Sequence, residues 1–247
     1  MQRTAVVTGG GSGIGRATSL RFARDGMQVA VWDINDGNAK AVAADIQAAG
    51  GRALACTVDV AQKASIATAL DATRTKFGPV TVLVNSAGIT AFDEFMTITE
   101  ALWDRIMAVN LKGTFLCAQA IVPDMLAAGW GRIVNISSSS TQTGAARMVH
   151  YASSKGGVIG LTRALAIEFA AQGITVNHVP PGFVDTPMQR KAHDDGFLDV
   201  VAFAAKMPMK REGRPEEVAA ACAYLVSEDA GYVTGHTLSV NGGRYLI

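Results

Sequence analysis

Short, almost continuously apolar runs recur along the chain, separated by longer segments in which alanine and leucine mix with charged residues. A strand that helices cover on both faces is apolar along its whole length, whereas a strand with one face in water alternates between apolar and polar residues. The pattern therefore predicts a covered sheet of about seven strands, at residues 5–7, 29–32, 54–58, 80–84, 132–136, 175–179 and 237–240.

The segments between these runs have the length and composition of helices, for example at 16–24, 38–49, 66–76 and 158–171. Glycines follow them where helix C-caps are expected, at Gly26, Gly50, Gly78 and Gly173. Strands that alternate with helices indicate an α/β fold with a doubly wound, Rossmann-type parallel sheet. No repeat or linker divides the sequence, so we predict a single domain over residues 1–247.

The alternation breaks between residues 182 and 211, where Pro181, Pro187 and Pro208 interrupt the pattern. Long irregular segments inside a domain are often functional lids. We interpret this one as a mobile lid over a pocket, the alternative being an ordinary surface excursion. Its apolar side chains can line that pocket or equally serve as packing or subunit contacts: Met188, Phe197, Leu198, Phe203 and Met207.

A glycine-rich turn follows the first predicted strand, since residues 8–15 read TGGGSGIG and a helical segment begins at Arg16. Turn glycines let the backbone approach a pyrophosphate, and the free N–H groups and dipole of a helix N-terminus attract it. The alternative is a tight turn without a ligand. The strand–turn–helix context favours a dinucleotide site.

Acidic residues follow the second and third predicted strands. Asp33 can accept hydrogen bonds from both adenosine ribose hydroxyls and would repel a 2′-phosphate. No arginine adjoins it, because Ile34 and Asn35 follow and Ser12 in the turn is neutral, so we predict NAD as the cofactor. The alternative is that Asp33 merely caps the next helix. Asp59 is placed to reach the adenine, and the small residues of 85–88, NSAG, permit close approach of the cofactor.

Tyr151 and Lys155 occur as YASSK at the start of a helical segment, and their i, i+4 spacing puts both side chains on one helix face. Tyrosine, with an ordinary pKa near 10, transfers protons poorly at pH 7 until a nearby cation stabilises its phenolate. The lysine can supply that cation, so the pair can act as general acid for ketone reduction and general base for alcohol oxidation. A hydroxyl of the serine run 137–140 can hold the carbonyl oxygen near the tyrosine.

Net charge, cysteine content and the N-terminal residues limit which partners and which cellular compartment we expect. A formal net charge of +1 argues against an electrostatically driven nucleic-acid or membrane partner. The three cysteines, Cys56, Cys117 and Cys222, are scattered singly, which suits a reducing compartment, and no Cys/His cluster suggests a metal. The first apolar run is too short for a signal peptide or membrane span. We therefore expect a cytoplasmic protein without a metal site, a nucleic-acid partner or a membrane partner.

Taken together and in order, these motifs resemble the short-chain dehydrogenases/reductases of about this length. The resemblance covers essentially the whole chain. It rests on TGGGSGIG at 8–15, NSAG at 85–88, Asn110, Ser138, Tyr151, Lys155, Pro181–Gly182 and Thr186. One departure is Ser86, which stands where the family usually has a second asparagine, and we expect little loss from it.

The resemblance implies a catalytic set of Asn110, Ser138, Tyr151 and Lys155. It selects Ser138 from the serine run and gives Asn110 a part in a water-linked proton relay from Lys155 to solvent. It also implies that Lys155 binds the nicotinamide ribose and Thr186 the carboxamide. The implied cofactor contacts are Gly9, Ser12, Gly13, Ile14, Gly15, Asp33, Asp59, Val60, Asn85, Ala87, Gly88, Tyr151, Lys155, Pro181, Gly182, Val184 and Thr186.

Within the family, the chain is similar to β-ketoacyl carrier-protein reductases and to catabolic NAD-dependent dehydrogenases of secondary alcohols and hydroxyacyl-CoA. The reductases of fatty-acid synthesis usually prefer NADPH and dock the acidic carrier protein with arginines, where this chain has Gly129 and Gln172. We therefore favour a catabolic alcohol or hydroxyacyl-CoA dehydrogenase, with a 3-oxoacyl-carrier-protein reductase as the alternative. Arg132, Arg163 and Arg147 are candidates for a different carrier-protein dock.

Three further expectations follow. Arg147 and His150 are candidates for the pocket rim. We favour the alternative, in which Arg147 is a solvated charge on a loop and His150 is packed inside the protein. The resemblance implies a homotetramer in which the helices carrying Asn110 and Tyr151 pair across a two-fold axis, with Leu116, Ile121, Leu161, Leu165 and the apolar end 240–247 at buried faces. The remote rival is a non-enzymatic NAD-binding sensor, which need not retain the catalytic side chains.

Overall fold

The computed structural model describes residues 2–246 and contains a six-stranded parallel sheet with the order β3-β2-β1-β4-β5-β6. The strands are β1 Thr4–Thr8, β2 Gln28–Asp33, β3 Arg52–Thr57, β4 Val82–Asn85, β5 Gly131–Ile136 and β6 Ile174–Val179. The strand order reverses between β1 and β4, and ligands of such sheets bind outside the carboxyl ends of the strands at this switch point. The predicted α/β, doubly wound fold is confirmed. Met1 and Ile247, the two ends of the predicted domain, lie outside the described residues.

Successive strand residues point to opposite faces of the sheet and enter separate cores. Val7 and Val31 are paired in register and belong to one core, while Val6 and Ala30, one residue earlier, belong to the other. All four are fully buried. This explains why the strands are continuous apolar runs in the sequence, since both faces are covered.

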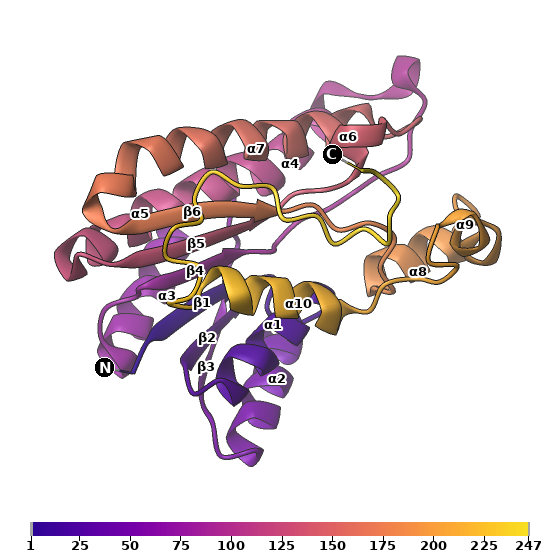
Figure 1. Cartoon of the computed structure of the whole chain (residues 1–247). Coiled ribbons are helices and arrows are strands. Elements are labelled where there is room, and N and C mark those ends of the chain that lie inside the picture. The colour runs from indigo at the N-terminus through magenta and orange to yellow at the C-terminus, as the bar shows by residue number, and fades with distance from the viewer. Residues whose placement is uncertain (1, 247) are drawn as a thin grey trace.

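Helices cover the sheet in two layers (Figure 1). One core packs against α1 Gly13–Arg24, α2 Asp36–Ala48 and α10 Pro215–Leu225. The other packs against α3 Lys63–Phe77, α5 Gly113–Ala128 and α7 Val149–Phe169, with α4 Glu100–Met107 leading into α5 through a π-helical turn, Ala108–Lys112. The glycines predicted to end helices, Gly26, Gly50, Gly78 and Gly173, all have positive φ, the backbone conformation that glycine adopts without strain.

The prediction of a seventh strand at 237–240 is wrong. This segment runs beside β6 but joins it only through isolated bridges, from His178 to Thr237 and from Pro181 to Val240. Pro180 and Pro181 follow β6 and carry no N–H group to donate to a neighbouring strand. The prolines therefore interrupt the ladder that a seventh strand would need.

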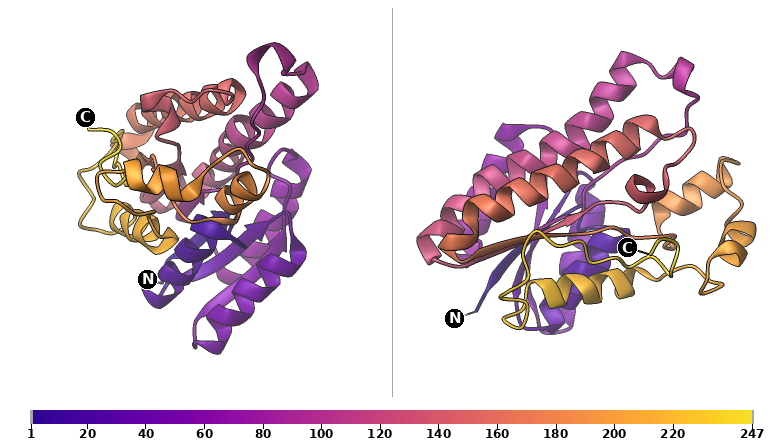
Figure 2. Two further views of the ribbon diagram at one scale, coloured as in Figure 1. Left: turned by 90° about the vertical axis from the view of Figure 1, so that its right-hand side faces the viewer. Right: turned by 45° about the horizontal axis from the view of Figure 1, so that its top comes forward.

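The irregular segment after β6 contains two helices, α8 Pro187–Asp194 and α9 Val200–Lys206. In Figure 1 the strand arrows point toward α8 and α9, which project beyond the carboxyl ends of the strands. Figure 2 shows the same two helices in front of the sheet when the molecule is viewed from that side. The short α6 Ser140–Thr143 follows β5. The predicted lid is thus in the position of a lid, and its mobility stays a prediction.

One continuous helical stretch of the described chain, Glu100–Ala128, is long and apolar enough to cross a membrane by length and composition alone. Half of its most apolar window is buried inside the protein. Leu116, Cys117, Ile121 and Met125 of this stretch belong to the core beneath the sheet. Its apolar character is therefore accounted for by packing within the chain.

Candidate active site

A cavity of about 900 Å³ opens at the carboxyl ends of the strands, beneath the lid. Its walls come from the glycine-rich turn, the end of β2, the segments after β3, β4, β5 and β6, the start of α7 and the lid. Because parallel strands all end at the same edge, residues far apart in sequence meet here. The cavity brings together Ser138, Tyr151 and Lys155 with most of the predicted cofactor contacts: Gly9, Ser12, Gly13, Ile14, Asp33, Asp59, Val60, Ala87, Gly88, Pro181, Gly182, Val184 and Thr186.

The glycine-rich turn fits a pyrophosphate. Gly9 and Gly13 have φ of +62° and +48°, and both line the cavity. A Cβ on Gly9 would lie 2.9 Å from the Cα of Ala87, so a side chain would collide with the backbone there. The Ser12 side chain does not cap α1, and the first turn of this helix holds no acidic residue. The helix N-terminus is therefore open to an anion in the cavity.

Two predicted cofactor contacts, Gly15 and Asn85, do not line the cavity. A Cβ on Gly15 would lie 2.1 Å from the carbonyl oxygen of Gly9, so this glycine lets α1 pack against the turn. Asn85 is buried, and its Nδ2 donates to Oδ1 of Asn135 on the neighbouring strand at 2.9 Å. Both residues support the walls of the cavity without forming its surface.

Asp33 ends β2, and its carboxylate lines the cavity. One oxygen accepts from the Gly11 N–H and the other from the Asn35 N–H, both at 2.9 Å. The next helix is capped by Asn35, whose side chain accepts from the Asn38 N–H, so the helix-cap alternative for Asp33 is wrong. The carboxylate is instead fixed between the glycine-rich turn and the start of α2.

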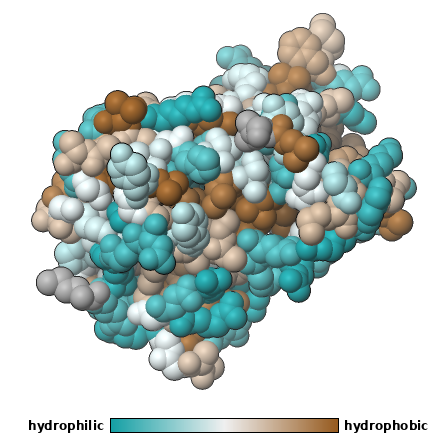
Figure 3. Space-filling model, in the orientation of Figure 1, coloured by the Kyte–Doolittle hydropathy of each residue, from teal (hydrophilic) through white to brown (hydrophobic). Residues whose placement is uncertain are grey.

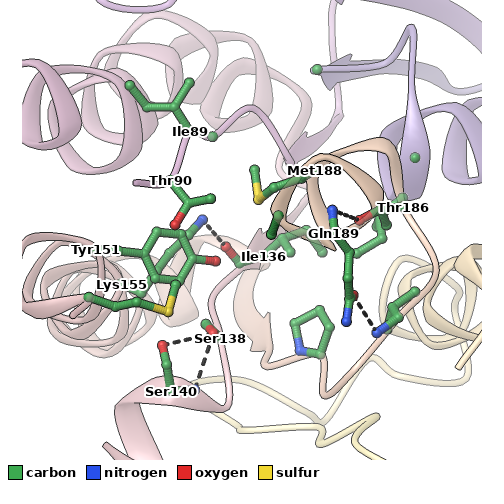
Figure 4. Close-up of a pocket in the computed structure, with 18 of the residues that line it drawn as sticks. Ile89, Thr90, Ile136, Ser138, Ser140, Tyr151, Lys155, Thr186, Met188 and Gln189 are labelled. Atoms are coloured by element: carbon green, nitrogen blue, oxygen red, sulfur yellow. Dashed lines mark hydrogen bonds between the residues drawn. The ribbon is translucent and has the colours of Figure 1, made fainter. Parts of the chain in front are cut away.

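Lys155 lies one turn after Tyr151 on α7, and both side chains reach the cavity (Figure 4). The ammonium is buried, and its Nζ donates to the carbonyl oxygen of Ile136 at 2.8 Å. Burial lowers the pKa of Lys155 to about 8, so the group is still charged at pH 7. Its Nζ is 5.9 Å from the centroid of the Tyr151 ring.

The Tyr151 hydroxyl does not have the lowered pKa that the sequence suggested. Burial raises the pKa of Tyr151, and the Ser138 hydroxyl offsets the rise only in part. Lys155 is not among the causes of the shift, since its ammonium is drawn to the Ile136 carbonyl and lies 5.9 Å from the centre of the ring. Tyr151 is therefore a neutral hydroxyl at pH 7, the protonation state of a general acid.

Ser138 follows β5 and lies near Tyr151 in the cavity wall (Figure 4). Its Oγ accepts from the Ser140 N–H at 3.1 Å and lies 2.9 Å from the Ser140 Oγ. The neighbouring Ser137 is buried with its hydroxyl 2.8 Å from Nδ1 of His178. Of the serines at 137–140, Ser138 is thus the one whose hydroxyl is directed to the tyrosine. The sequence of four serines did not by itself indicate which of them has this position.

Asn110 does not line the cavity, because it is completely buried in the π-helical turn. Its Oδ1 accepts from the Ile89 N–H and its Nδ2 donates to both the Ile89 carbonyl and Ser154 Oγ, at 2.9, 3.0 and 3.0 Å. A Cβ on Gly88 would lie 3.3 Å from the Asn110 Oδ1 and 3.4 Å from the Lys155 Nζ. The asparagine therefore holds the cavity wall close to the lysine.

Thr186 and the lid close the other wall (Figure 4). The Thr186 hydroxyl caps α8 by accepting from the Gln189 N–H, and the Gln189 side chain accepts from the Val184 N–H at 3.1 Å. The lid side chains predicted to line a pocket do so, except that Met207 borders a separate cavity of about 120 Å³. The main cavity is lined by Met188, Phe197, Leu198 and Phe203.

Of the two candidates for the pocket rim, Arg147 lines the cavity and His150 does not. His150 is fully buried, and its Nδ1 accepts from the Tyr151 N–H at 2.9 Å, so it is a packed histidine. Sequence reasoning missed Arg244, which also lines the cavity. No local motif marks it, because only the path of the C-terminal segment brings it there.

The residues considered for carrier-protein docking lie elsewhere. Gly129 and Gln172 precede β5 and β6, at the amino ends of the strands, whereas the cavity lies at the carboxyl ends. They therefore do not border the cavity of the same chain. Arg132 is also excluded from that role, since it is buried and its guanidinium donates to the carbonyls of Gly131 and Gly173.

Comparison with known proteins identifies relatives along the whole chain. The sequence profile described as enoyl-(acyl carrier protein) reductase matches residues 9–244. The chain is 41% identical to the (2S)-[(R)-hydroxy(phenyl)methyl]succinyl-CoA dehydrogenase subunit BbsD of Thauera aromatica, over 99% of this chain and 97% of the relative. It is 38% identical to a 3-oxoacyl-[acyl-carrier-protein] reductase of Staphylococcus epidermidis, with complete coverage of both chains. A crystal structure named ribose-5-phosphate isomerase, from Brucella melitensis, superposes with a TM-score of 0.91 at 34% identity, covering 98% of this chain and 92% of that one.

Proposed function

The chain belongs to the short-chain dehydrogenase/reductase family and is an oxidoreductase acting on the CH–OH group, and we propose that it is an NAD-dependent dehydrogenase of a secondary alcohol or hydroxyacyl-CoA. The observation that carries the proposal is the meeting of Tyr151, Ser138 and Lys155 in one cavity with an open helix N-terminus. A non-enzymatic sensor would have no need of these three groups at one site.

A nicotinamide cofactor, when bound, supplies or accepts the hydride. Gly9, Gly13 and the start of α1 would hold its pyrophosphate, and Asp33 its adenosine ribose. Ser138 donates a hydrogen bond to the carbonyl oxygen of the substrate and holds it near Tyr151. Tyr151 donates its proton to that oxygen during reduction. During oxidation the deprotonated form of Tyr151, its phenolate, accepts the proton of the alcohol, while Lys155 keeps a positive charge beside the reacting atoms.

The proposal of NAD over NADP rests on Asp33 and on the ion pairs that the nearby basic residues already form. Arg16 forms an ion pair with Asp45 at 3.0 Å, and Lys40 forms one with Asp36 at 2.7 Å. Neither cation is directed to Asp33, so neither would compensate the repulsion between Asp33 and a 2′-phosphate. This supports NAD, and a cellular NAD pool favours the oxidative direction.

The test is an oxidation screen of aryl, cyclic and 3-hydroxyacyl-CoA alcohols with NAD and NADP. We expect turnover of at least one class with NAD. The alternative, a carrier-protein reductase, is supported by the relative from Staphylococcus epidermidis. It is distinguished by comparing kcat/KM for the same β-ketoacyl group on CoA and on carrier protein across a salt series. A large, salt-sensitive advantage of the carrier protein would favour the alternative.

We also propose a homotetramer in the cytoplasm. Leu116 and Ile121 do not support this, because the core of their own chain buries them. Exposed apolar side chains on the outer helices support it instead: Phe115 on α5 and Ile167 on α7. Figure 3 shows further apolar side chains in a hollow on the face that the C-terminal segment crosses in Figure 1. Light scattering at micromolar concentration tests the oligomeric state. The proposal of the cytoplasm is supported by the three free, buried cysteines, which suit a reducing compartment.

A further inference from the structure

The charged side chains that line the cavity are unevenly distributed. Its two acids, Asp33 and Asp59, follow β2 and β3, at the end where the adenosine is expected. The part formed by the residues after β5, the lid and the C-terminal segment has only cations among the described residues: Arg147, Lys155 and Arg244. A fourth cation, Arg105, lines the cavity from α4. The substrate end of the cavity is therefore positive.

Arg244 is the most unusual of these cations. It is half-buried, and its guanidinium carbon lies 4.9 Å from the centroid of the Phe203 ring on the lid. The one hydrogen bond of its guanidinium within residues 2–246 is a long one from Nη1 to the Ser139 Oγ, at 3.4 Å, beside Ser138. No carboxylate lies within 4.0 Å of it in the part of the chain that the structure describes.

Two other arginines, one partly buried and one buried, have hydrogen-bond partners for their guanidinium groups. Arg74 makes a two-pronged contact with the Asp124 carboxylate, at 3.0 and 2.8 Å. Arg132 donates to backbone carbonyls. A guanidinium has five N–H donors, so Arg244 keeps most of its donors available to the cavity. Burial also lowers the pKa of Arg244, the direction expected for a cation that is partly withdrawn from water.

Arg147 stands at the mouth of the same cavity, in a backbone conformation that favours glycine, with φ of +64°. Its guanidinium carbon lies 5.4 Å from the centroid of the Phe197 ring, which stacks on Phe92. A long basic side chain at a strained position that lines a cavity suggests that the side chain itself is needed there. Both arginines thus lie against aromatic rings of the lid.

We propose that Arg244, with Arg147 at the mouth, binds a negatively charged group of the substrate and so determines specificity for an anionic alcohol or ketone. The inference rests on the proposed dehydrogenase function and specifies its substrate class. The contact with Phe203 holds the guanidinium at the cavity wall, and its paired donors match a carboxylate or phosphate. The anion is a carboxylate of the acyl part or a phosphate of a thioester carrier, and the probes below separate the two.

The test uses four ketones that differ in charge. Acetoacetate is paired with its neutral methyl ester, and acetoacetyl-CoA with its neutral N-acetylcysteamine thioester. We expect the wild-type enzyme to prefer one anionic member over its neutral partner, and Arg244→Met to lower kcat/KM for that member by at least ~10-fold. The neutral partners should change by less than about 3-fold, and Arg244→Lys should lie between wild type and Arg244→Met. Loss with acetoacetate assigns a carboxylate, and loss with acetoacetyl-CoA assigns a phosphate.

Two controls complete the design. Arg24→Met removes an exposed arginine from the far end of α1 and should leave all four values unchanged. Calorimetry with butyrate and butyramide on the NADH complex gives a readout without turnover, in which only butyrate binding should depend on Arg244 if the anion is a carboxylate. NADH affinity should be the same in wild type and Arg244→Met.

The inference is overturned if Arg244→Met lowers all four values equally, or if it weakens NADH binding as much as turnover, because the arginine would then serve the fold or the cofactor. It is also overturned if the wild type oxidises neutral alcohols well but shows no preference for the anionic ketones. That result would leave the proposed dehydrogenase function intact, whereas the absence of turnover with every alcohol and ketone would reject the proposed function itself.

Discussion

Asn110 holds Ile89 by both of its backbone polar groups: the Oδ1 accepts from the Ile89 N–H at 2.9 Å, and the Nδ2 donates to the Ile89 carbonyl at 3.0 Å. This pair ties the wall of the cavity after β4 to the π-helical turn before α5. Asn110 itself has no surface in the cavity. Its influence on the reaction therefore includes the position of Gly88 and Ile89 next to Lys155.

Asn110→Ala should impair both stability and turnover. The change leaves the Ile89 N–H and carbonyl without their partner, and a buried polar group left unsatisfied costs roughly 1–3 kcal/mol. We expect the free energy of unfolding, from urea titration, to fall by about that amount and kcat to fall at least ~10-fold. Thr99→Ala, which removes the exposed cap of α4 at a cost of ~1 kcal/mol, should keep its activity. Equal activity of the two variants would contradict the positioning role.

Tyr151→Phe should abolish most turnover and leave NADH binding close to that of the wild type. The substitution removes the proton-transferring hydroxyl, and general acid–base catalysis is typically worth ~10²–10⁴-fold. Steady-state kinetics and NADH fluorescence titration measure the two effects separately. Tyr232→Phe, at a fully exposed tyrosine, is the matched control and should be inert. Retention of half the wild-type kcat by Tyr151→Phe would exclude this residue as the proton donor.

NAD should be preferred over NADP by at least ~100-fold in kcat/KM, because like charges brought together without solvent cost several kcal/mol. Asp33→Asn should reduce this ratio by about tenfold or more, since it removes the charge and keeps an acceptor for Gly11 or Asn35. Asp25→Asn, at a surface ion pair with Arg21, should not alter the ratio. Similar efficiency of the wild type with both cofactors would show that Asp33 does not face the ribose.

Stability should depend on the titration of His178. Burial, with smaller contributions from Arg163 and His236, lowers the pKa of His178 to about 4 from 6.5. Its ring nitrogens lie 2.8 Å from the Ser137 Oγ and 2.7 Å from the Thr237 Oγ1, where a neutral imidazole fits. In the unfolded chain the histidine binds a proton near pH 6.5, whereas in the folded chain it does so only near pH 4. Its contribution to stability is therefore full above pH 6.5 and is lost as the pH falls toward 4.

Urea titrations between pH 7.5 and 4 measure this dependence, and we expect the loss attributable to His178 to disappear in His178→Gln. NMR titration of the imidazole resonances of the wild type provides a measurement that does not require the variant to fold. A His178 pKa at or above 6.5 in the folded protein would contradict the prediction.

Local patterns in the sequence were enough to predict the α/β class, six of the strands, the glycine-terminated helices and the family. These patterns are apolar runs of strand length, glycines where φ is positive, and motifs such as TGGGSGIG and YASSK. A short motif also fixes its own residues relative to one another. The spacing of Tyr151 and Lys155 therefore placed both side chains on one helix face.

Long-range packing and burial settled the features that no local pattern contains. The segment 237–240 does not form a strand because two prolines in another segment interrupt the pairing. Leu116 lies in the core because its face of the helix is the one that meets the sheet. The pKa of Tyr151 depended on its burial and on the Ser138 hydroxyl, which a different segment of the chain supplies. Arg244 reaches the cavity only because the C-terminal segment folds back across the carboxyl end of the sheet. Its contact with Ser139 joins residues 105 positions apart, and no local spacing in the sequence predicts such a contact.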